Sequence, residues 1–438
     1  MDEQKKNLTT LTKGSNAKDK KTSSAGKNEL SPRKRHCPSN SKENVPSKKK
    51  NVKNVTEKLE CEKFFGKNTK LHQNNVVKVF CQLERGYNKS SAMKRIADWK
   101  HKWKLRRFHI FKRMESPDKR VSAIQWHPSK PSWLGIGGRT GTFWMYNQAI
   151  DLTYEVYSSS DLLSDGIQGI GFNTRQNEYV YTVSNVALKC CNYRNWKKSN
   201  LISIDEDYNS CWLTCMDVHK DGKSIYVGDD KGGLVVHSLD SGQNSWREGK
   251  GKRLHTSKIR HLEFNPQDPN LMATASLDKT VKLWDIRMLD DCVESLQHGF
   301  GVAAAKFSRT DGCYLLSTDM NNEVRVYKAP LWRLEHKIEH EHHFISSLTH
   351  FKASWHPLAD LFLVGSFPDV PAEDRLSKEL RGVDVYSAKT GRLCHQLTES
   401  HLLISLCEFN CAGQVLATSA SSLGCVSLWR SKAHKFQH

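Results

Sequence analysis

One short pattern recurs seven times between residue 121 and the end of the chain. In each copy an aromatic or apolar residue is followed by a turn triplet, as in IQWHP (124–128) and LEFNP (262–266). Successive anchor residues are 46, 46, 46, 43, 48 and 54 positions apart. Short alternating strands with Gly, Asp and Asn turns fill each unit, and a period of about 40–45 residues with four strands is typical of a propeller blade. The anchors are Trp126, Phe172, Val218, Phe264, Phe307, Trp355 and Phe409.

The repeat predicts an all-β fold, a seven-bladed WD-repeat β-propeller. A closed ring of units leaves no exposed sheet edge. An open array of β-sandwich units, the alternative, does not predict such regular spacing of the anchors. In each unit the anchor is followed by a second signal that we expect to end a strand. These second positions are Trp144, Cys190, Val236, Trp284, Tyr327, Tyr386 and Trp429.

The fourth unit, LHTSKIRHLEFNP…LMATASLDKTVKLWDIR (254–287), resembles the WD-repeat consensus most closely. By that resemblance His255, Ser276, Asp278 and Trp284 form the buried hydrogen-bonded network of the blade, in which the carboxylate orients the imidazole. A catalytic triad is the rival interpretation. We reject it because the blade explains every one of these positions.

Motifs that carry catalytic or metal chemistry are missing from the sequence. It contains no phosphate-binding Gly loop, no H-E-x-x-H and no G-x-S-x-G. His336, His340, His342 and His343 are close together, but no acidic or Cys cluster with ligand spacing accompanies them. We therefore expect a binding platform, not an enzyme, with no cofactor and no metal.

Lysine and arginine are concentrated at the N-terminus. Residues 1–120 contain 33 Lys and Arg against 12 Asp and Glu, whereas residues 121–438 contain 34 against 35. Residues 1–70 have too few apolar side chains to fold alone, so we expect a disordered basic arm. The arm is either a solubilising tail or a contact for an acidic partner such as nucleic acid. Its clusters SPRKRH (31–36) and SKKK (47–50) favour nuclear-localisation signals over ordinary solvated charge.

Two further expectations concern the chain before and around the propeller. We expect a helix-loop-helix at 71–117, with residues 75–113 helical, and the propeller at 118–432. The first helix carries an apolar stripe that includes Val77, Phe80 and Leu83. This helical segment is either a lid on the propeller or a docking element for another protein. The start of the chain is too polar for a secretory signal, and no apolar run is long enough for a membrane span.

The strand order of a blade assigns residues to the two faces of the ring. Connections D–A and B–C open on what we call the first face, and connections A–B and C–D open on the second face. Lys119 precedes strand A of blade one, Arg139 lies in its B–C turn, and Lys258 precedes strand A of blade four. Arg381 lies in a long B–C insertion of blade six. We expect a cationic first face, although these residues are equally compatible with the scattered charges of any propeller rim.

The segment before strand A of blade six carries one apolar projection, Phe344–Ile345. Lysine and arginine neutralise phosphates and release counterions, and an apolar side chain can wedge between weakened base steps. Because unstacking costs less at a damaged step, a wedge discriminates by deformability and not by base edges. A cationic face with such a projection suits damaged nucleic acid.

Several longer segments resemble the damage-specific DNA-binding protein 2 family, the small subunit of the complex that detects ultraviolet lesions in DNA. These segments are more specific than a generic WD repeat, and the resemblance covers roughly residues 75–430. They are VVKVFCQLERG, DKRVSAIQWHP, ATASLDKTVKLWDIR, LLSTDMNNEVRVY, SLTHFKASWHP, VGSFPD and ELRGVDVYSAKTGRL.

The resemblance implies that one face holds DNA. In the family a hairpin inserts a Phe-Gln-His triplet at the lesion, and the matching positions here are Ile345, Ser346 and Ser347. A one-residue shift places Phe344 at the wedge; either alignment keeps an apolar tip and loses the Gln-His pair. The basic DNA contacts of the family match Lys119, Arg139 and Lys258, and Arg381 matches a further arginine.

The resemblance also implies a protein partner, the large multi-propeller adaptor of a cullin-4 RING ubiquitin ligase. In the family this adaptor binds the helix-loop-helix and the second face through W-D-x-R boxes. The box is intact here with Asp285 and Arg287, and the helical contacts match Val77, Phe80 and Leu83. The resemblance implies a nuclear substrate receptor for nucleotide-excision repair that binds damaged double-stranded DNA, with histones as a further partner. The alternative is a WD-repeat scaffold or ligase receptor that binds a chromatin protein, which the altered wedge triplet favours.

Overall fold

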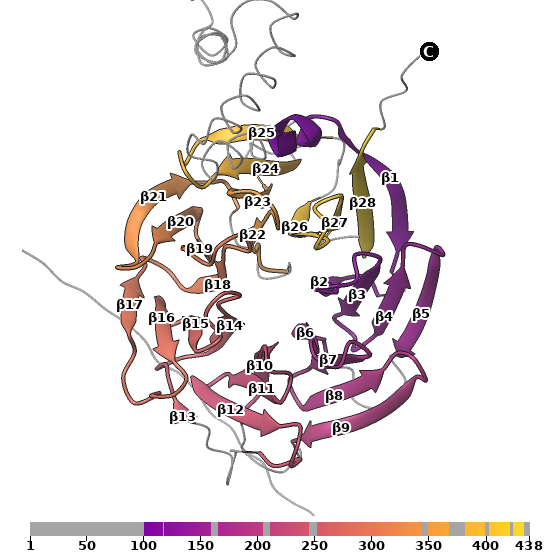
Figure 1. Ribbon diagram of the computed structural model, residues 1–438, viewed down its shortest axis with the longest axis vertical. Helices are drawn as coiled ribbons and strands as arrows, with labels where there is room; N and C mark the ends of the chain where they lie inside the picture. The colour runs from indigo at the N-terminus through magenta and orange to yellow at the C-terminus, as the bar shows by residue number, and fades with distance from the viewer. Residues whose placement is uncertain are drawn as a thin grey trace, which may run out of the picture. The chain divides into compact units, whose positions relative to one another are not determined.

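The computed structural model describes residues 100–116, 118–158, 165–204, 211–244, 252–342, 349–367, 382–398, 403–420 and 424–432. In these residues the chain forms seven four-stranded antiparallel sheets around a central channel, as the sequence predicted (Figure 1). Residues 100–105 are helical. No helix in this part of the chain is long and apolar enough to cross a bilayer. The basic arm at 1–70 and most of the expected helix-loop-helix lie outside the described residues.

Blades one to four follow one another along the chain, and each pairs its strands in chain order from the channel outwards. Blade one contains β2 (Val121–Trp126), β3 (Trp133–Gly138), β4 (Phe143–Asn147) and β5 (Leu152–Tyr157). Blade two contains β6 (Gly169–Phe172), β7 (Tyr179–Val183), β8 (Ala187–Asn192) and β9 (Lys197–Ser203). Blade three contains β10 (Leu213–Val218), β11 (Ser224–Asp229), β12 (Gly233–Ser238) and β13 (Lys252–Arg253). Blade four contains β14 (Ile259–Phe264), β15 (Leu271–Ser276), β16 (Thr280–Asp285) and β17 (Glu294–Gln297).

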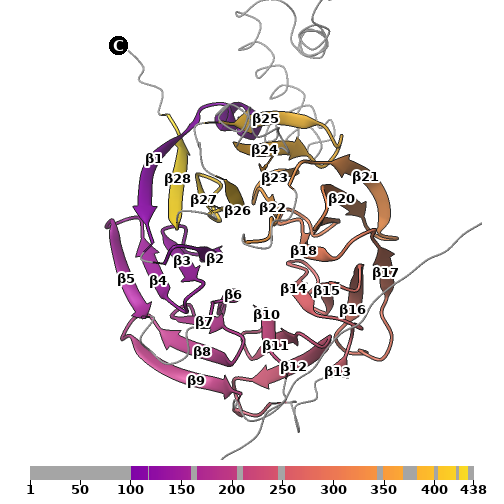
Figure 2. The same ribbon diagram turned by 180° about the vertical axis from the view of Figure 1, so that it is seen from behind.

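The last three blades complete the ring (Figure 2). Blade five contains β18 (Val302–Phe307), β19 (Tyr314–Asp319), β20 (Glu323–Lys328) and β21 (Arg333–Glu339). Blade six contains β22 (Ser354–Trp355), β23 (Leu361–Ser366), β24 (Gly382–Ser387) and β25 (Leu393–Leu397). Blade seven contains β26 (Ile404–Phe409), β27 (Val415–Ala420), β28 (Cys425–Ser431) and, as its outermost strand, β1 (Phe108–Glu115).

The first strand of the propeller joins the two ends of the chain. Strand β1 pairs with β28 from Phe108↔Ser431 to Glu115↔Cys425 and so supplies the fourth strand of the last blade. The prediction that residues 75–113 are helical is therefore wrong for 108–113, and the propeller begins at Phe108 and not at 118. The local apolar pattern was misleading, because strand pairing with residues far along the chain overrides helical propensity.

Every aromatic or apolar anchor ends the innermost strand of its blade, as the repeat predicted. Two of the anchors also hold neighbouring blades together through their indole groups. Trp126 Nε1 donates to the carbonyl of Glu408 at 3.0 Å, and Trp355 Nε1 donates to the carbonyl of Lys306 at 2.8 Å. Apolar clusters fill the gaps between blades, so the core lies between adjacent sheets and the outermost strands stay exposed.

The second signal is misplaced in the first three blades. In blade four Met272 pairs with Trp284, and the corresponding pair in blade one joins Leu134 to Tyr146, two residues after the expected Trp144. In blades two and three the corresponding residues are Cys191 and His237, one after Cys190 and Val236. No tryptophan marks this position in these blades, so the pattern alone did not resolve the register. In blades five to seven the expected residues occupy it.

Candidate nucleic-acid interface

Three cations predicted from the repeat register lie on the first face. Lys119 lies two residues before β2, and Arg139 lies in the β3–β4 turn of the same blade. Lys258 directly precedes β14, and its carbonyl accepts a hydrogen bond from Leu277 N at 3.0 Å. Lys119 and Arg139 are exposed, whereas Lys258 is half-buried. The first face thus presents cations from blades one and four.

A buried aspartate fixes the cationic corner of blade one. Asp118 Oδ2 accepts hydrogen bonds from Thr140 N at 2.6 Å and from Thr140 Oγ1 at 2.7 Å, which joins the connection between β1 and β2 to the β3–β4 turn. A Cβ atom at Gly138 would lie 2.2 Å from this carboxylate oxygen, so the turn requires glycine there. The corner therefore holds Lys119 and Arg139 on one rigid base.

Three aspartates of the first face are held by backbone N–H groups of tight turns. Asp229 accepts from Gly233 N at 2.6 Å, and Asp319 accepts from Asn321 N and Glu323 N, both at 2.9 Å. Asp118 behaves in the same way. A carboxylate that accepts from backbone N–H groups is held in place and does not reach out to pair with neighbouring side chains. The exposed Lys119 and Arg139 side chains are therefore not paired with these aspartates.

A second group of basic residues surrounds the opening of the central channel. Arg260 is the second residue of β14, and Lys352 lies two residues before β22. The guanidinium of Arg260 donates to the ring of His350, with Nη2 3.0 Å from Nε2 and closer still to Nδ1. None of these three residues was predicted from the sequence. A cation three or four positions before the anchor of a blade is the signal that marks this position.

Burial and mutual repulsion shift the pKa values at the channel opening. Burial lowers the pKa of His350 to about 2, and nearby cations, Arg260 first among them, add to the effect. The ring is therefore neutral and able to accept a hydrogen bond. Burial and then Arg260 lower the pKa of Lys352 to about 8, and the same two causes lower the pKa of Lys258.

Two exposed side chains extend the first face and were also missed. Trp212 directly precedes β10 and is 56 % exposed, and its backbone N–H donates to Asp230 Oδ1 at 2.7 Å. Lys279 lies in the β15–β16 turn, is exposed and has a positive φ of 70°. An exposed indole on a face that also carries cations is a suitable surface for stacking against a base or sugar.

The expected wedge and one expected arginine lie outside the described residues. They are Phe344, Ile345, Ser346, Ser347 and Arg381. The residues that flank the wedge segment are well held on the first face. His342 N donates to Asn322 Oδ1 at 2.9 Å, and Thr349 Oγ1 donates to the carbonyl of Val121 in blade one at 2.8 Å.

The second face carries the W-D-x-R box of blade four. Asp285 ends β16, and Arg287 follows in the C–D connection, where Nη2 donates to Asp285 Oδ2 at 2.6 Å and Nε donates to Oδ1 at 2.9 Å. These hydrogen bonds lower the pKa of Asp285 to about 2. The Arg287 side chain is 68 % exposed, and Met288 and Val293 expose 71 % and 57 % of their surface nearby in sequence. The other predicted contacts of this kind, Val77, Phe80 and Leu83, lie outside the described residues.

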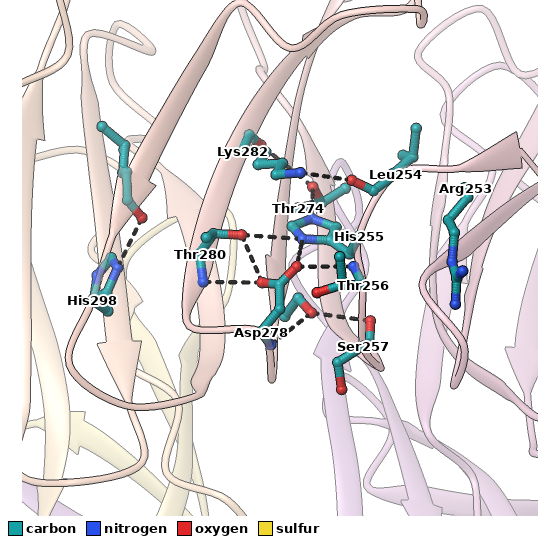
Figure 3. Close-up of polar contacts among 12 residues, drawn as sticks. Arg253, Leu254, His255, Thr256, Ser257, Thr274, Asp278, Thr280, Lys282 and His298 are labelled. Atoms are coloured by element: carbon teal, nitrogen blue, oxygen red, sulfur yellow. Dashed lines mark hydrogen bonds and ion pairs between the residues drawn. The ribbon is translucent and has the colours of Figure 1, made fainter.

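The four predicted network residues of blade four lie in one hydrogen-bonded group. Figure 3 shows His255 and Asp278 at its centre. His255 Nδ1 lies 2.9 Å from Asp278 Oδ2, and Nε2 lies 2.7 Å from Thr274 Oγ1, which also accepts from Trp284 Nε1 at 2.8 Å. Ser276 joins the group because its hydroxyl accepts from Asp278 N at 3.1 Å. Thr274, the residue that connects the histidine to the tryptophan, was not foreseen.

The charge of this network follows from its burial. Burial lowers the pKa of His255, against the opposing effect of Asp278, so the ring is neutral near pH 7. Burial raises the pKa of Asp278, but hydrogen bonds from His255 and Thr280 outweigh it and hold that pKa below its usual value. His340 and His342 of the His-rich stretch are similarly occupied, by Asp384 and by the carbonyl of Asp319. In the described residues no group of three or more His, Cys, Asp or Glu is arranged to hold a metal ion.

Comparison with known proteins gives the family. A WD domain, G-beta repeat, matches residues 252–285, which contain the network of blade four. DNA damage-binding protein 2 of Gallus gallus is 34 % identical over 326 residues, which are 72 % of this chain and 63 % of the chicken protein. The mouse (Mus musculus) protein of that name is 32 % identical over 72 % of each chain, and the bovine (Bos taurus) protein is 33 % identical over 72 % of this chain and 73 % of its own. The chain belongs to the DNA damage-binding protein 2 family. The damage-specific resemblance that the motifs indicated is therefore confirmed.

Proposed function

We propose that the first face binds damaged double-stranded DNA. The observation that carries this proposal is the imbalance of charge on that face. Lys119, Arg139, Lys258, Arg260 and Lys352 form no ion pair with a carboxylate among the described residues, and the aspartates of the face are held by backbone N–H groups. Unpaired cations on one rigid surface suit phosphates, and the names of the chicken, mouse and bovine relatives agree with this partner.

The lesion is recognised by deformation of the duplex. In this proposal Lys119, Arg139, Lys258 and Arg381 clamp phosphates, while Phe344–Ile345 wedge into the damaged step with Ser346 and Ser347 beside them. A damaged step costs less to unstack, so the wedge favours ultraviolet photolesions over intact DNA. The flanking anchors of the wedge segment, His342 and Thr349, support this role, because a wedge needs a rigid base. No catalytic residue is required, and the protein acts as a sensor and not as an enzyme.

A direct binding measurement tests this function. The full chain is titrated with two labelled duplexes of identical sequence, one of which contains a single cyclobutane pyrimidine dimer, at one fixed salt concentration. We expect tighter binding to the damaged duplex. Equal affinities would refute lesion recognition and favour the alternative, a WD-repeat scaffold whose first face binds a chromatin protein. The loss of the family's Gln-His pair at Ser346 and Ser347 is the observation that favours this alternative.

The second face is proposed to bind the adaptor of a cullin-4 RING ubiquitin ligase. Arg287 is prealigned by Asp285, is largely exposed and lies in a connection that also exposes Met288. Val77, Phe80 and Leu83 supply the remaining contacts. The protein would then act in the nucleus as a substrate receptor that brings the ligase to chromatin in nucleotide-excision repair. Histones would be a further partner.

Binding of the purified adaptor to an Arg287→Ala variant tests this assignment. The expected result is a clear loss of adaptor binding with unchanged affinity for damaged DNA. If the variant binds the adaptor at full strength, the assignment of the second face is wrong.

A further inference from the structure

The opening of the central channel on the first face concentrates cations that form no ion pair with a carboxylate among the described residues. Here we call Arg139, Lys258, Arg260, His350 and Lys352 the channel mouth. The last three residues come from the inner ends of blades four and six, where strand A begins. Lys352 lines a cavity of about 80 Å³ together with His261, Glu263 and Glu408. The cavity is much smaller than the pockets of about 300–1,000 Å³ that hold organic ligands. It admits water or a small ion, not a base or a sugar.

Further along the channel, carboxylates and cations occur together. The carboxylates Glu263 and Glu408 lie one residue before their anchors, toward the second face, with Lys306 at the corresponding position of blade five. Arg309 Nη2 lies 3.8 Å from Glu263 Oε1, and Gln125 Nε2 donates to Glu408 Oε1 at 2.8 Å. The two glutamates therefore have partners of their own, whereas the cations of the channel mouth have no carboxylate at ion-pair distance among the described residues.

The carboxylates closest to the channel mouth are already occupied. Asp165 and Asp230 attract Lys258. Asp165 Oδ2 accepts from Val186 N at 2.8 Å, and Asp230 Oδ1 accepts from Trp212 N at 2.7 Å. Neither carboxylate lies within ion-pair distance of a channel-mouth cation among the described residues. Four cations thus remain close together, and the lowered pKa values of Lys258, Arg260 and Lys352 show that their repulsion and burial cost free energy.

The contact between Arg260 and His350 holds the guanidinium in one orientation. A neutral imidazole accepts from Nη2 and leaves the other guanidinium N–H groups available. A planar guanidinium that is held in one orientation is suited to bind two oxygens of a phosphate, whereas a lysine supplies only a point charge. The half-buried position of Arg260 strengthens such a contact, because solvent screens it less than a contact on the rim.

We propose that the channel mouth is an oxyanion site that binds one backbone phosphate of the DNA, with Arg260 and Lys352 as its central contacts and His350 as the residue that positions Arg260. The site rests on the proposed function of the first face and specifies where the duplex crosses the channel. Lys258 and Arg139 lie at its rim and bind the same phosphate or its neighbours. The site takes phosphate irrespective of base sequence.

The salt dependence of DNA binding tests the site. For the full chain, the logarithm of the association constant for a damaged duplex is measured against the logarithm of salt concentration. Loss of one phosphate contact lowers the magnitude of this slope by about one. We expect this change in Arg260→Ala, and a smaller loss of affinity in Arg260→Lys, which keeps the charge but not the planar group. Arg175→Ala, which removes an exposed arginine from the second face, is the matched control and should leave the slope unchanged.

His350 needs its own comparison, because a positioning residue acts only through its partner. The amide oxygen of glutamine can accept the same hydrogen bond, so His350→Gln should keep the wild-type slope, whereas His350→Ala should show part of the Arg260→Ala effect. Thermal unfolding of each variant establishes that it is folded. If His350→Gln and His350→Ala behave alike, the positioning role is refuted.

Inorganic pyrophosphate distinguishes a free anion from a DNA phosphate as the ligand. Its binding to the full chain is measured by calorimetry with and without the Arg260→Ala change. Competition between pyrophosphate and DNA at this site supports the proposal. Saturable pyrophosphate binding with an unchanged DNA salt slope in Arg260→Ala overturns it. Failure of the proposed function is distinguishable, because equal affinity for damaged and intact duplexes refutes lesion recognition while the slope still reports the phosphate contact.

Discussion

At the scale of single residues, hydrogen bonds keep the aspartates of the first face apart from its lysine and arginine side chains. The carboxylate oxygens of Asp118 and Asp319 accept hydrogen bonds from backbone N–H groups of tight turns, and lysine and arginine side chains project beyond them. A near-neutral propeller can therefore present a cationic surface, which the charge count of the whole body conceals. Lys258 is the cation best suited to a test of this surface, because it is half-buried and its charge interacts with that of Arg260.

Reversal of one charge at Lys258 should weaken DNA binding strongly. A Lys258→Glu change removes a phosphate contact and places a carboxylate next to Arg260, where it competes with phosphate for the guanidinium. We expect at least a tenfold loss of affinity for damaged and intact duplexes alike, and a smaller salt slope. Fluorescence anisotropy at several salt concentrations measures both quantities. Arg175→Glu on the second face is the control, and an equal loss in that variant would show that overall charge, not position, is responsible.

At the scale of elements, blade four shows how a buried polar group stabilises a sheet. Asp278 receives hydrogen bonds from Thr256 N at 3.1 Å and from Thr280 Oγ1 at 2.6 Å, in addition to its contact with His255. The carboxylate thus links the connection before β14 to the β15–β16 turn. Removal of the acceptor would leave the buried ring of His255 without this partner, which costs more than the hydrogen bond itself contributes.

Asp278→Ala should therefore destabilise the propeller by about 1.5–3 kcal/mol. Because the folded-state pKa of Asp278 is lowered, its stabilising effect is present above the ordinary aspartate pKa and is lost as pH falls through the folded value. The difference in unfolding free energy between wild type and variant should be flat from about pH 6 to 8 and shrink below about pH 4. Urea unfolding across this range is the measurement, with exposed Ser295→Ala as control. A difference that grows on acidification would contradict the assigned charge state.

The strand that closes the ring makes a second prediction at this scale. Phe108 in β1 is 7 % exposed and contacts Phe409 edge-on, with ring centroids 5.8 Å apart. We expect Phe108→Ala to lower the free energy of unfolding by about 3–5 kcal/mol, as for other buried aromatic side chains. Arg113→Ala on the same strand removes only an exposed side chain and should change it by less than about 0.5 kcal/mol. Similar values for the two variants would mean that β1 does not close the ring in solution.

What the sequence could predict depended on how local each signal is. The anchors from Trp126 to Phe409 end strands as expected, because an aromatic residue followed by a turn is a signal within one strand. Strand β1 was misread because its partner, β28, lies more than 300 residues further along the chain. The contact between Arg260 and His350 was missed for a similar reason. It joins residues 90 positions apart, and no pattern within either blade predicts it.

At the scale of the whole propeller, the ring separates two binding surfaces by a packed body. Connections D–A and B–C carry the cations of the first face, and connections A–B and C–D carry Arg287 on the second. Each blade contributes to both faces through one rigid sheet, and apolar clusters join every blade to its neighbours. A densely packed body of this kind transmits little of a local change at one surface to the other, unless it has two alternative packings.

The two proposed surfaces should therefore act independently, which a double-variant cycle can measure. Lys258→Glu is expected to weaken DNA binding without affecting the adaptor, and Arg287→Ala is expected to do the opposite. Because the two residues share no partner and lie on opposite faces, their effects on each ligand should add to within about 0.5 kcal/mol in the double variant. The measurement is the affinity of all four proteins for damaged DNA, alone and with saturating adaptor. A coupling above this limit would show that adaptor binding changes the DNA surface, and the ring would then act as a transmitter between its faces and not as a rigid separator.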